Sequence, residues 1–202
     1  MSNLSKKKIA ITGSIGSGKS TLKNILIKKG YAVFDSDECV AYLYKQDKHL
    51  KQTFSKLVGD VISNNEIDKR KLKGLLFDDP SKREVVESLV HPKVLEAFYE
   101  FERKNPDNIL FAEIPLLFEI NWQHYFDEVW FVYADVQVVK ERLKKHRKLD
   151  DKTINTMLKW QLDPQKKCAM TPFVLYNNSE ISDLEKQVDQ HLQRLETINN
   201  EQ

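Results

Sequence analysis

The 202-residue sequence has few cysteines, glycines and prolines, no long apolar run and almost no excess charge. The two cysteines, Cys39 and Cys168, do not form a CxxC pair, so neither a disulfide framework nor a structural zinc site is expected. We interpret both as reduced thiols of a cytoplasmic protein. The 32 basic and 30 acidic residues leave a net charge of +2, which argues against a generic nucleic-acid or membrane-surface binder. No apolar run approaches the roughly 20 residues that span a bilayer, and the apolar stretch after the polar start is too short for a signal peptide.

The order of apolar segments predicts an α/β fold. Apolar residues make up 41% of the chain, which is enough for one compact domain with a core. Segments with helical periodicity separate several short runs of β-branched and aromatic residues, and this order is typical of a parallel sheet with helices on both faces. The predicted strands are residues 8–12, 31–34, 108–114, 128–134 and 173–176, and the last is followed by a predicted helix near 182–195.

Two segments depart from this alternation. Residues 37–106 show helical patterns only, including 84–90 and 92–103, and they predict a helical subdomain inserted into the sheet. Residues 140–165 predict a second helical insertion that is strongly basic at its start. We therefore expect a single domain over residues 1–202, with a frayed polar tail from Thr197 onward. Its core segments are expected at about residues 6–36, 107–139 and 166–196.

Residues 13–20, Gly-Ser-Ile-Gly-Ser-Gly-Lys-Ser, match the phosphate-loop (Walker A) pattern G-x-x-x-x-G-K-[ST] without a mismatch. They follow a predicted strand and open a predicted helix, which is the context the motif needs and which a chance match in a flexible turn would lack. The loop backbone would wrap the phosphates of ATP with its N–H groups. Lys19 would reach the β- and γ-phosphates, Ser20 would bind Mg²⁺, and Thr21 would contact the α-phosphate. The residues expected to bind ATP are Gly16, Ser17, Gly18, Lys19, Ser20 and Thr21.

Several strings of residues together resemble the dephospho-coenzyme A kinase family, over nearly the whole chain. The matching segments are residues 12–21, Asp35-Ser-Asp37, Leu89-Val-His91-Pro92, Ile114-Pro-Leu-Leu-Phe-Glu119 and Asn177. The phosphate loop alone would indicate only a P-loop protein, whereas the Ile-Pro-Leu-Leu-Phe-Glu string and the His-Pro pair are more specific. The resemblance implies a P-loop NTPase three-layer α/β/α core with a parallel sheet. It also implies that residues 37–106 bind the substrate and that residues 140–165 form a lid.

The resemblance further implies a reaction. Such kinases transfer the γ-phosphoryl group of ATP to the ribose 3′-hydroxyl of dephospho-coenzyme A, the last step of coenzyme A synthesis. The implied partners are ATP and dephospho-coenzyme A, with Mg²⁺ as cofactor and without nucleic acid or membrane, and we expect a monomer or weak homo-oligomer. Asp37 matches the catalytic acidic residue by position, and it follows a strand beside the loop, where it would orient the acceptor or help to hold Mg²⁺. The alternative is that Asp35 or Asp37 only caps the next helix.

Four other residues have two interpretations each. Glu113, where the family usually has Asp, would hold Mg²⁺ through water or make a structural hydrogen bond to the loop. His91 would contact the substrate, or His91–Pro92 would simply start a helix. Asn177 would lie near the adenine of ATP or be an ordinary turn residue. Arg142 would close over the triphosphate and, with Lys19, stabilise its charge, whereas the basic run around it would otherwise be a solvated helix face.

The sequence also departs from the family pattern. Arginines that are usual in the family are replaced by Ala41, Leu95, His146 and Met157. Arginine binds phosphate through two parallel hydrogen bonds, so these changes put phosphate affinity in doubt, although Arg147 or Lys148 would compensate in a rotated lid. Gln161 matches the family pattern in the second half of the lid. The alternatives are a related P-loop kinase with another small-molecule or nucleotide acceptor, and a non-catalytic relative that binds nucleotide.

Overall fold

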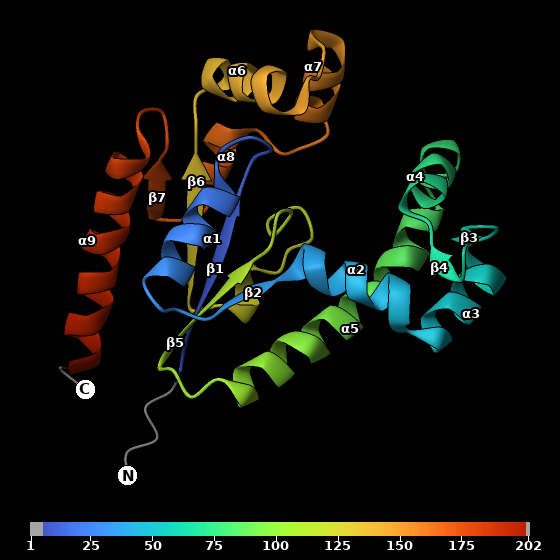
Figure 1. The fold of residues 1–202 in the computed structure, drawn as a ribbon, viewed down its shortest axis with the longest axis horizontal. Coiled ribbons are helices and arrows are strands. Elements are labelled where there is room, and N and C mark those ends of the chain that lie inside the picture. Colours follow the sequence, from blue (N-terminus) through green and yellow to red (C-terminus); the bar gives the residue numbers. More distant parts are fainter. Residues whose placement is uncertain (1–5, 201–202) are drawn as a thin grey trace. The chain divides into compact units, whose positions relative to one another are not determined.

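The computed structural model describes the backbone of residues 6–200 and the side chains of residues 6–197 (Figure 1). The chain divides into two compact units, which are described separately. Unit 1 comprises residues 1–34 and 107–202, and unit 2 comprises residues 35–106. Among the described residues, no helix is both long enough and apolar enough to cross a membrane.

Unit 1 is built on a five-stranded sheet with the order β2-β5-β1-β6-β7. These strands are β1 (Lys7–Gly13), β2 (Val33–Asp35), β5 (Ile109–Glu113), β6 (Glu128–Tyr133) and β7 (Phe173–Tyr176). The pairs β1–β5, β1–β6 and β6–β7 are parallel, with Ile11 opposite Glu113 and Gly13 opposite Val132. The strand positions predicted from the sequence are correct to within two residues at each end, and the expected α/β fold with a parallel sheet is confirmed.

One face of this sheet packs against α1 (Lys19–Lys28) and α9 (Ile181–Asn200), which lie side by side (Figure 1). Alternate strand residues point into this layer, because successive side chains of a strand face opposite sides. The buried cluster includes Ile9, Ile11, Phe111, Trp130, Leu22, Leu26, Leu184 and Val188. The expectation of a frayed tail from Thr197 is wrong as far as residue 200, because α9 continues and the Thr197 hydroxyl donates to the Gln193 carbonyl at 2.9 Å. Residues 201–202 lie outside the described residues.

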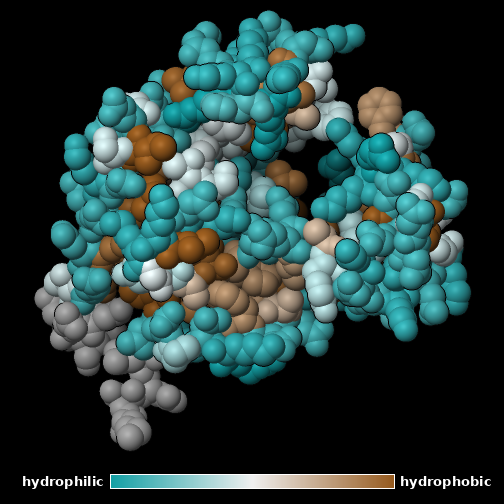
Figure 2. All heavy atoms as spheres, in the orientation of Figure 1, coloured by the Kyte–Doolittle hydropathy of each residue, from teal (hydrophilic) through white to brown (hydrophobic). Residues whose placement is uncertain are grey.

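The basic insertion forms a helical pair, α6 (Val136–Arg147) and α7 (Asp151–Lys159), which we call the lid segment together with the residues that follow to 162. A short helix, α8 (Pro164–Cys168), contacts β6 and leads to β7, and η1 (Gln123–Tyr125) lies before β6. The pair has its own small core, made of Ala134, Val139, Leu143 and Ile154. The visible surface over α6 and α7 is mostly hydrophilic (Figure 2).

Unit 2 is mainly helical, as expected, but it also contains a hairpin that the sequence analysis missed. Its helices are α2 (Ser36–Gln46), α3 (Lys48–Leu57), α4 (Lys69–Asp78) and α5 (Lys82–Lys104). The strands β3 (Ile62–Ser63) and β4 (Glu66–Ile67) pair antiparallel across Asn64 and Asn65, which have φ angles of 49° and 62°. Asparagine tolerates this left-handed conformation, which two-residue hairpin turns require. The expectation that this segment has no strand is therefore wrong.

Pro92 lies inside α5, so the prediction that His91–Pro92 starts a helix is wrong, and the two predicted helices are one. A proline inside a helix removes one backbone hydrogen bond and costs about 3 kcal/mol. The helix nevertheless continues because its apolar stripe, with a residue at every fourth position, packs against α2, α3 and α4. Burying each such side chain contributes about 1.5–3 kcal/mol, so the stripe outweighs the cost. Its buried residues are Val86, Val90, Val94 and Phe98.

Candidate functional site

The phosphate loop lies between the end of β1 and the start of α1, as the sequence predicts. Gly16 and Gly18 have φ angles of 73° and 105°, in the left-handed region that favours glycine. A Cβ atom on Gly18 would collide with the side-chain nitrogen of Asn177. Gly18 is also the N-cap of α1, whose first N–H groups have no partners within the helix and give its start a partial positive charge. The loop is therefore shaped to receive an anion.

Lys19 is held at this loop by two backbone carbonyls. Its Nζ donates to Gly13 O at 2.8 Å and to Ser14 O at 3.2 Å. The next residue, Ser20, is exposed in the first turn of α1, and Thr21 is partly buried beside it. The ammonium group and the start of the helix thus face the same space, which suits a chain of phosphates.

Asn177 and Arg142 meet the loop at Ser17. The Asn177 side chain is buried, its Nδ2 donates to Ser17 O at 2.8 Å, and its backbone N–H donates to Tyr133 O at 2.8 Å. Arg142 of α6 makes long contacts from its guanidinium group to Ser17 O (3.5 Å) and to Asn177 Oδ1 (3.4 Å). The two predicted residues are therefore brought together at the loop. Their roles toward adenine and the triphosphate stay predictions.

Glu113 ends β5 and is buried. Its carboxylate lies 3.5 Å from the Nζ of Lys23, one helical turn after Lys19 on α1. The pair links the strand to the helix that the phosphate loop opens. This contact supports a structural role for Glu113, and its carboxylate remains of the right chemistry for a water-bridged Mg²⁺.

The remaining predicted residues belong to unit 2. The side chain of Asp35 caps α2 by accepting from the Glu38 N–H at 2.9 Å, whereas Asp37 is exposed in the first turn. The capping role that was the alternative for either carboxylate therefore falls to Asp35. His91 is half-buried within α5, and burial lowers the pKa of its imidazole while the nearby Glu87 opposes this shift. The catalytic and substrate-binding roles of Asp37 and His91 stay predictions.

Most cations of the lid are exposed, and Lys144 makes an ion pair with Asp151 at 2.8 Å. The positions where the family usually carries arginine are not core positions. His146 and Ala41 are exposed, and Leu95 and Met157 are partly buried. An arginine at any of the four would therefore not be fully buried, and the effect of the missing guanidinium groups on phosphate affinity stays a prediction.

The lid segment reaches the phosphate loop through contacts that the sequence did not predict. Ile15 packs against the apolar core of α6 and α7. Its backbone N–H donates to Gln161 Oε1 at 2.9 Å, across 146 residues of sequence. In the sequence, the only indication that Gln161 matters was its match to the family pattern, and this match did not identify Ile15 as its partner.

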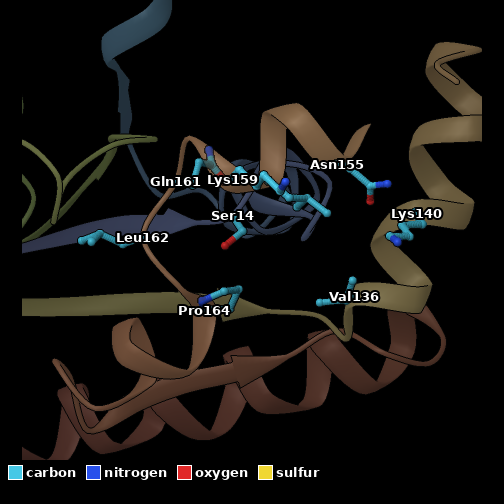
Figure 3. Close-up of a pocket in the computed structure, with 9 residues that line it drawn as sticks. Ser14, Val136, Lys140, Asn155, Lys159, Gln161, Leu162 and Pro164 are labelled. Atoms are coloured by element: carbon cyan, nitrogen blue, oxygen red, sulfur yellow. The ribbon is translucent and has the colours of Figure 1, made fainter. Parts of the chain in front are cut away.

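A cavity of about 360 Å³ lies beside this contact (Figure 3). Ser14 of the loop lies in its wall, and its side-chain oxygen is buried with no hydrogen-bond partner among the described residues. Gln161 and Lys159 lie on the same side of Ser14 in the close-up (Figure 3). The cavity is otherwise lined by Val136, Lys140, Asn155, Leu158, Leu162 and Pro164. It shows that the lid rests on one flank of the loop without filling all the space there.

Comparisons with known proteins show which family this chain resembles in sequence and in fold. The model of the dephospho-CoA kinase family matches residues 7–183. The dephospho-CoA kinase of Fusobacterium nucleatum is 31% identical over 183 residues, which cover 90% of this chain and 94% of that one. The crystal structure of TT1252 from Thermus thermophilus superposes with a TM-score of 0.83 at 29% identity, covering 95% of this chain and 98% of that one. The dephospho-CoA kinase of Campylobacter jejuni shares the fold, with a TM-score of 0.69 at 23% identity, covering 96% and 99%.

The family match extends beyond the phosphate loop. It spans both the loop and the helical insertion of unit 2, as well as the lid segment and β7. A match confined to the loop would not distinguish one P-loop kinase from another, whereas this one covers more than four-fifths of the chain. The chain therefore belongs to the dephospho-CoA kinase family, the enzymes that phosphorylate dephospho-coenzyme A with ATP.

Proposed function

We propose that this chain transfers the γ-phosphoryl group of ATP to the ribose 3′-hydroxyl of dephospho-coenzyme A. The observation that carries the use of ATP is the phosphate loop, in which Lys19 is held by two carbonyls at the start of α1, and the family match over residues 7–183 supports the choice of acceptor. In the transfer, the bond between the γ-phosphorus and the β–γ bridging oxygen breaks while a bond from the acceptor oxygen forms. ADP leaves and the acceptor loses its proton.

Lys19 and Arg142 would stabilise the charge that develops during transfer. Lys19 is held at the loop by the carbonyls of Gly13 and Ser14, and from there it would contact the β- and γ-phosphates. Arg142 already lies against Ser17 and is half-buried, so its guanidinium group would act in a partly desolvated site. Preorganised cations of this kind stabilise a transition state without having to reorganise.

Asp37 would position the acceptor. The cap of α2 is made by Asp35, so the carboxylate of Asp37 is not needed to cap that helix. A carboxylate with an ordinary pKa of about 3.9 is a weak base, so orientation of the hydroxyl contributes more than proton abstraction. The proton released in transfer would pass to this carboxylate and then to water. His91 is the candidate for a further substrate contact from unit 2.

The residues of the site fit Mg²⁺ as the cofactor. Mg²⁺ binds oxygen ligands, keeps several waters and usually takes only one or two protein ligands beside the substrate phosphates. The Ser20 hydroxyl would bind it directly, with Glu113 and Asp37 acting through water. No cluster of three or more His, Cys, Asp or Glu residues is present among the described residues, which suits an ion held mainly by phosphates. When bound, Mg²⁺ would neutralise phosphate charge.

We also propose a location and an oligomeric state for the enzyme. Cys39 and Cys168 are free thiols, which is consistent with the cytoplasm as the proposed location. We expect the protein to act as a monomer or weak homo-oligomer.

An assay of ADP release with ATP and dephospho-coenzyme A tests the proposed roles. Lys19→Ala should weaken both ATP binding and transfer, because it removes the charge that contacts the phosphates. Asp37→Ala should abolish transfer while leaving ATP binding intact. Lys28→Ala, in the last turn of α1, and Glu84→Ala, in the first turn of α5, are matched controls at exposed positions and should behave like the wild type.

Three results would reject parts of the proposal. Near-normal turnover of the Asp37 variant would remove its assigned role. ADP release that responds to another alcohol or nucleotide, but not to dephospho-coenzyme A, would favour a related kinase with a changed acceptor site. ATP binding without transfer to any acceptor would favour a non-catalytic relative.

A further inference from the structure

The peptide group between Ser14 and Ile15 is held on both sides. Its carbonyl, Ser14 O, accepts from Lys19 Nζ at 3.2 Å and from the Ser17 N–H at 3.2 Å. Its N–H, on Ile15, donates to Gln161 Oε1 at 2.9 Å. In a planar trans peptide the C=O and N–H groups point in opposite directions. A hydrogen bond that fixes the N–H toward the lid therefore also fixes the carbonyl toward Lys19.

Gln161 is itself held in place from the core of unit 1. It follows the last turn of α7, where its N–H donates to Leu158 O at 3.3 Å. The next N–H, on Leu162, donates to Glu119 Oε1 at 3.2 Å. The same carboxylate oxygen lies 2.6 Å from the Nζ of Lys167, whose side chain is completely buried. The end of the lid segment is thus attached to the loop after β5 and to α8.

The Glu119–Lys167 pair is not optimised for stability. Glu119 Oε2 and Lys167 Nζ are buried without a well-formed hydrogen bond among the described residues, so the ion contact is supported mainly by the Leu162 N–H that donates to Glu119 Oε1. Buried charges of this kind are weak contributors to stability compared with apolar side chains of similar size. Their position at the Gln161–Leu162 segment fits a role in placing that segment.

We propose that Gln161 is a positioning residue that acts on Lys19 through the Ser14–Ile15 peptide. The lid segment sets the direction of that peptide, and the Ser14 carbonyl then holds the ammonium group of Lys19 where the phosphates arrive. The Glu119–Lys167 pair keeps Gln161 within reach of the loop. This inference rests on the proposed phosphate-binding role of Lys19, and it does not depend on which acceptor the enzyme uses.

A double-mutant cycle on ATP binding tests the inference. The four proteins are the wild type, Gln161→Leu, Lys19→Ala and the double variant, titrated with a fluorescent ATP analogue up to millimolar concentrations. Loss of one hydrogen bond that acts through Lys19 should weaken binding by about 3–10-fold in the wild-type background. In the Lys19→Ala background the same change should weaken binding less than about 2-fold, because its target is absent. Gln137→Leu removes an exposed lid glutamine whose side chain donates to Glu141 Oε1 at 3.1 Å, and it should leave the affinity unchanged.

Hydrogen exchange at the Ile15 amide is the second measurement. Exchange should become faster in Gln161→Leu and remain slow in Gln161→Glu, since a carboxylate also accepts the N–H, and in Gln137→Leu. An equal loss of affinity in both Lys19 backgrounds would overturn the inference, because Gln161 would then act independently of Lys19. Tighter ATP binding by Gln161→Leu would also overturn it, and would indicate that Gln161 competes with the nucleotide for the loop. Neither readout needs an acceptor, so a failure of the dephospho-coenzyme A assignment would be seen separately.

Discussion

Replacing Gly18 by alanine tests how closely the phosphate loop is packed. Gly18 has a φ of 105°, where a side chain costs roughly 1–2 kcal/mol of backbone strain. The added methyl group would also displace the Asn177 side chain, which is buried and donates to Ser17 O at 2.8 Å. Breaking that bond leaves the buried side-chain nitrogen of Asn177 without its partner and costs about 1–3 kcal/mol more. The expected total loss is about 2–5 kcal/mol in the free energy of unfolding.

Gly30 provides a matched control for the backbone strain. Its φ is 91°, and among the described residues no heavy atom beyond its chain neighbours lies within 4 Å of an added Cβ. Backbone strain alone should therefore lower the free energy of unfolding of Gly30→Ala, by about 1–2 kcal/mol. Urea denaturation measures both variants, and ATP binding should fall for Gly18→Ala alone because Asn177 supports the loop. Equal unfolding free energies and equal ATP affinities for the two variants would refute this reasoning.

Two further predictions concern ionisable groups that are partly or fully buried. Lys167→Met leaves the Glu119 carboxylate buried without its cation, so thermal unfolding should show a loss of about 3–5 kcal/mol. Lys167→Met/Glu119→Leu should recover most of it, and a single variant as stable as the wild type would contradict the argument. Burial lowers the pKa of His191, with a smaller contribution from Arg194 and against the charge of Glu128. As the pH falls, the His191 imidazole of the unfolded chain is therefore protonated before that of the folded chain. The free energy of unfolding should then decrease as the pH drops below about 6.5. In His191→Phe the free energy of unfolding should change less steeply with pH than in the wild type. An unchanged pH dependence would show that other groups produce it.

The features that the sequence predicted correctly have local signals. The five strands are short β-branched or aromatic runs, and the phosphate loop is defined by eight consecutive residues whose backbone conformation needs glycine. Their order along the chain then restricts the topology to a parallel sheet. The same local information placed the loop and Lys19 at one end of a strand, whereas Asn177 was singled out by the family resemblance.

The wrong predictions in unit 2 concern a helix start and a hairpin, for which the sequence signal was misleading or too short. Pro92 is typical of a helix start, yet the apolar stripe of α5 carries the helix through it. Asn64 and Asn65 are the signal of a two-residue hairpin, but the strands on either side have only two residues each, too few to show alternation.

The contacts of the lid could not be predicted because their partners are far apart in sequence. Gln161 and Ile15 are separated by 146 residues. Glu119 lies in a string that the family resemblance singled out, but no sequence pattern connects it to Lys167. Lys167 follows another lysine, Lys166, and from the sequence alone it looks like a solvent-exposed residue. Such pairs become visible only when the fold brings them together.

The decisive measurement is the product formed by the purified wild-type protein from ATP and dephospho-coenzyme A, identified by phosphorus NMR and compared with ADP release. We predict a new phosphomonoester on the ribose 3′-oxygen, formed in equal amount to ADP and absent with Lys19→Ala. ADP release that is the same with and without dephospho-coenzyme A, or a phosphate on any other oxygen, would contradict the proposed reaction.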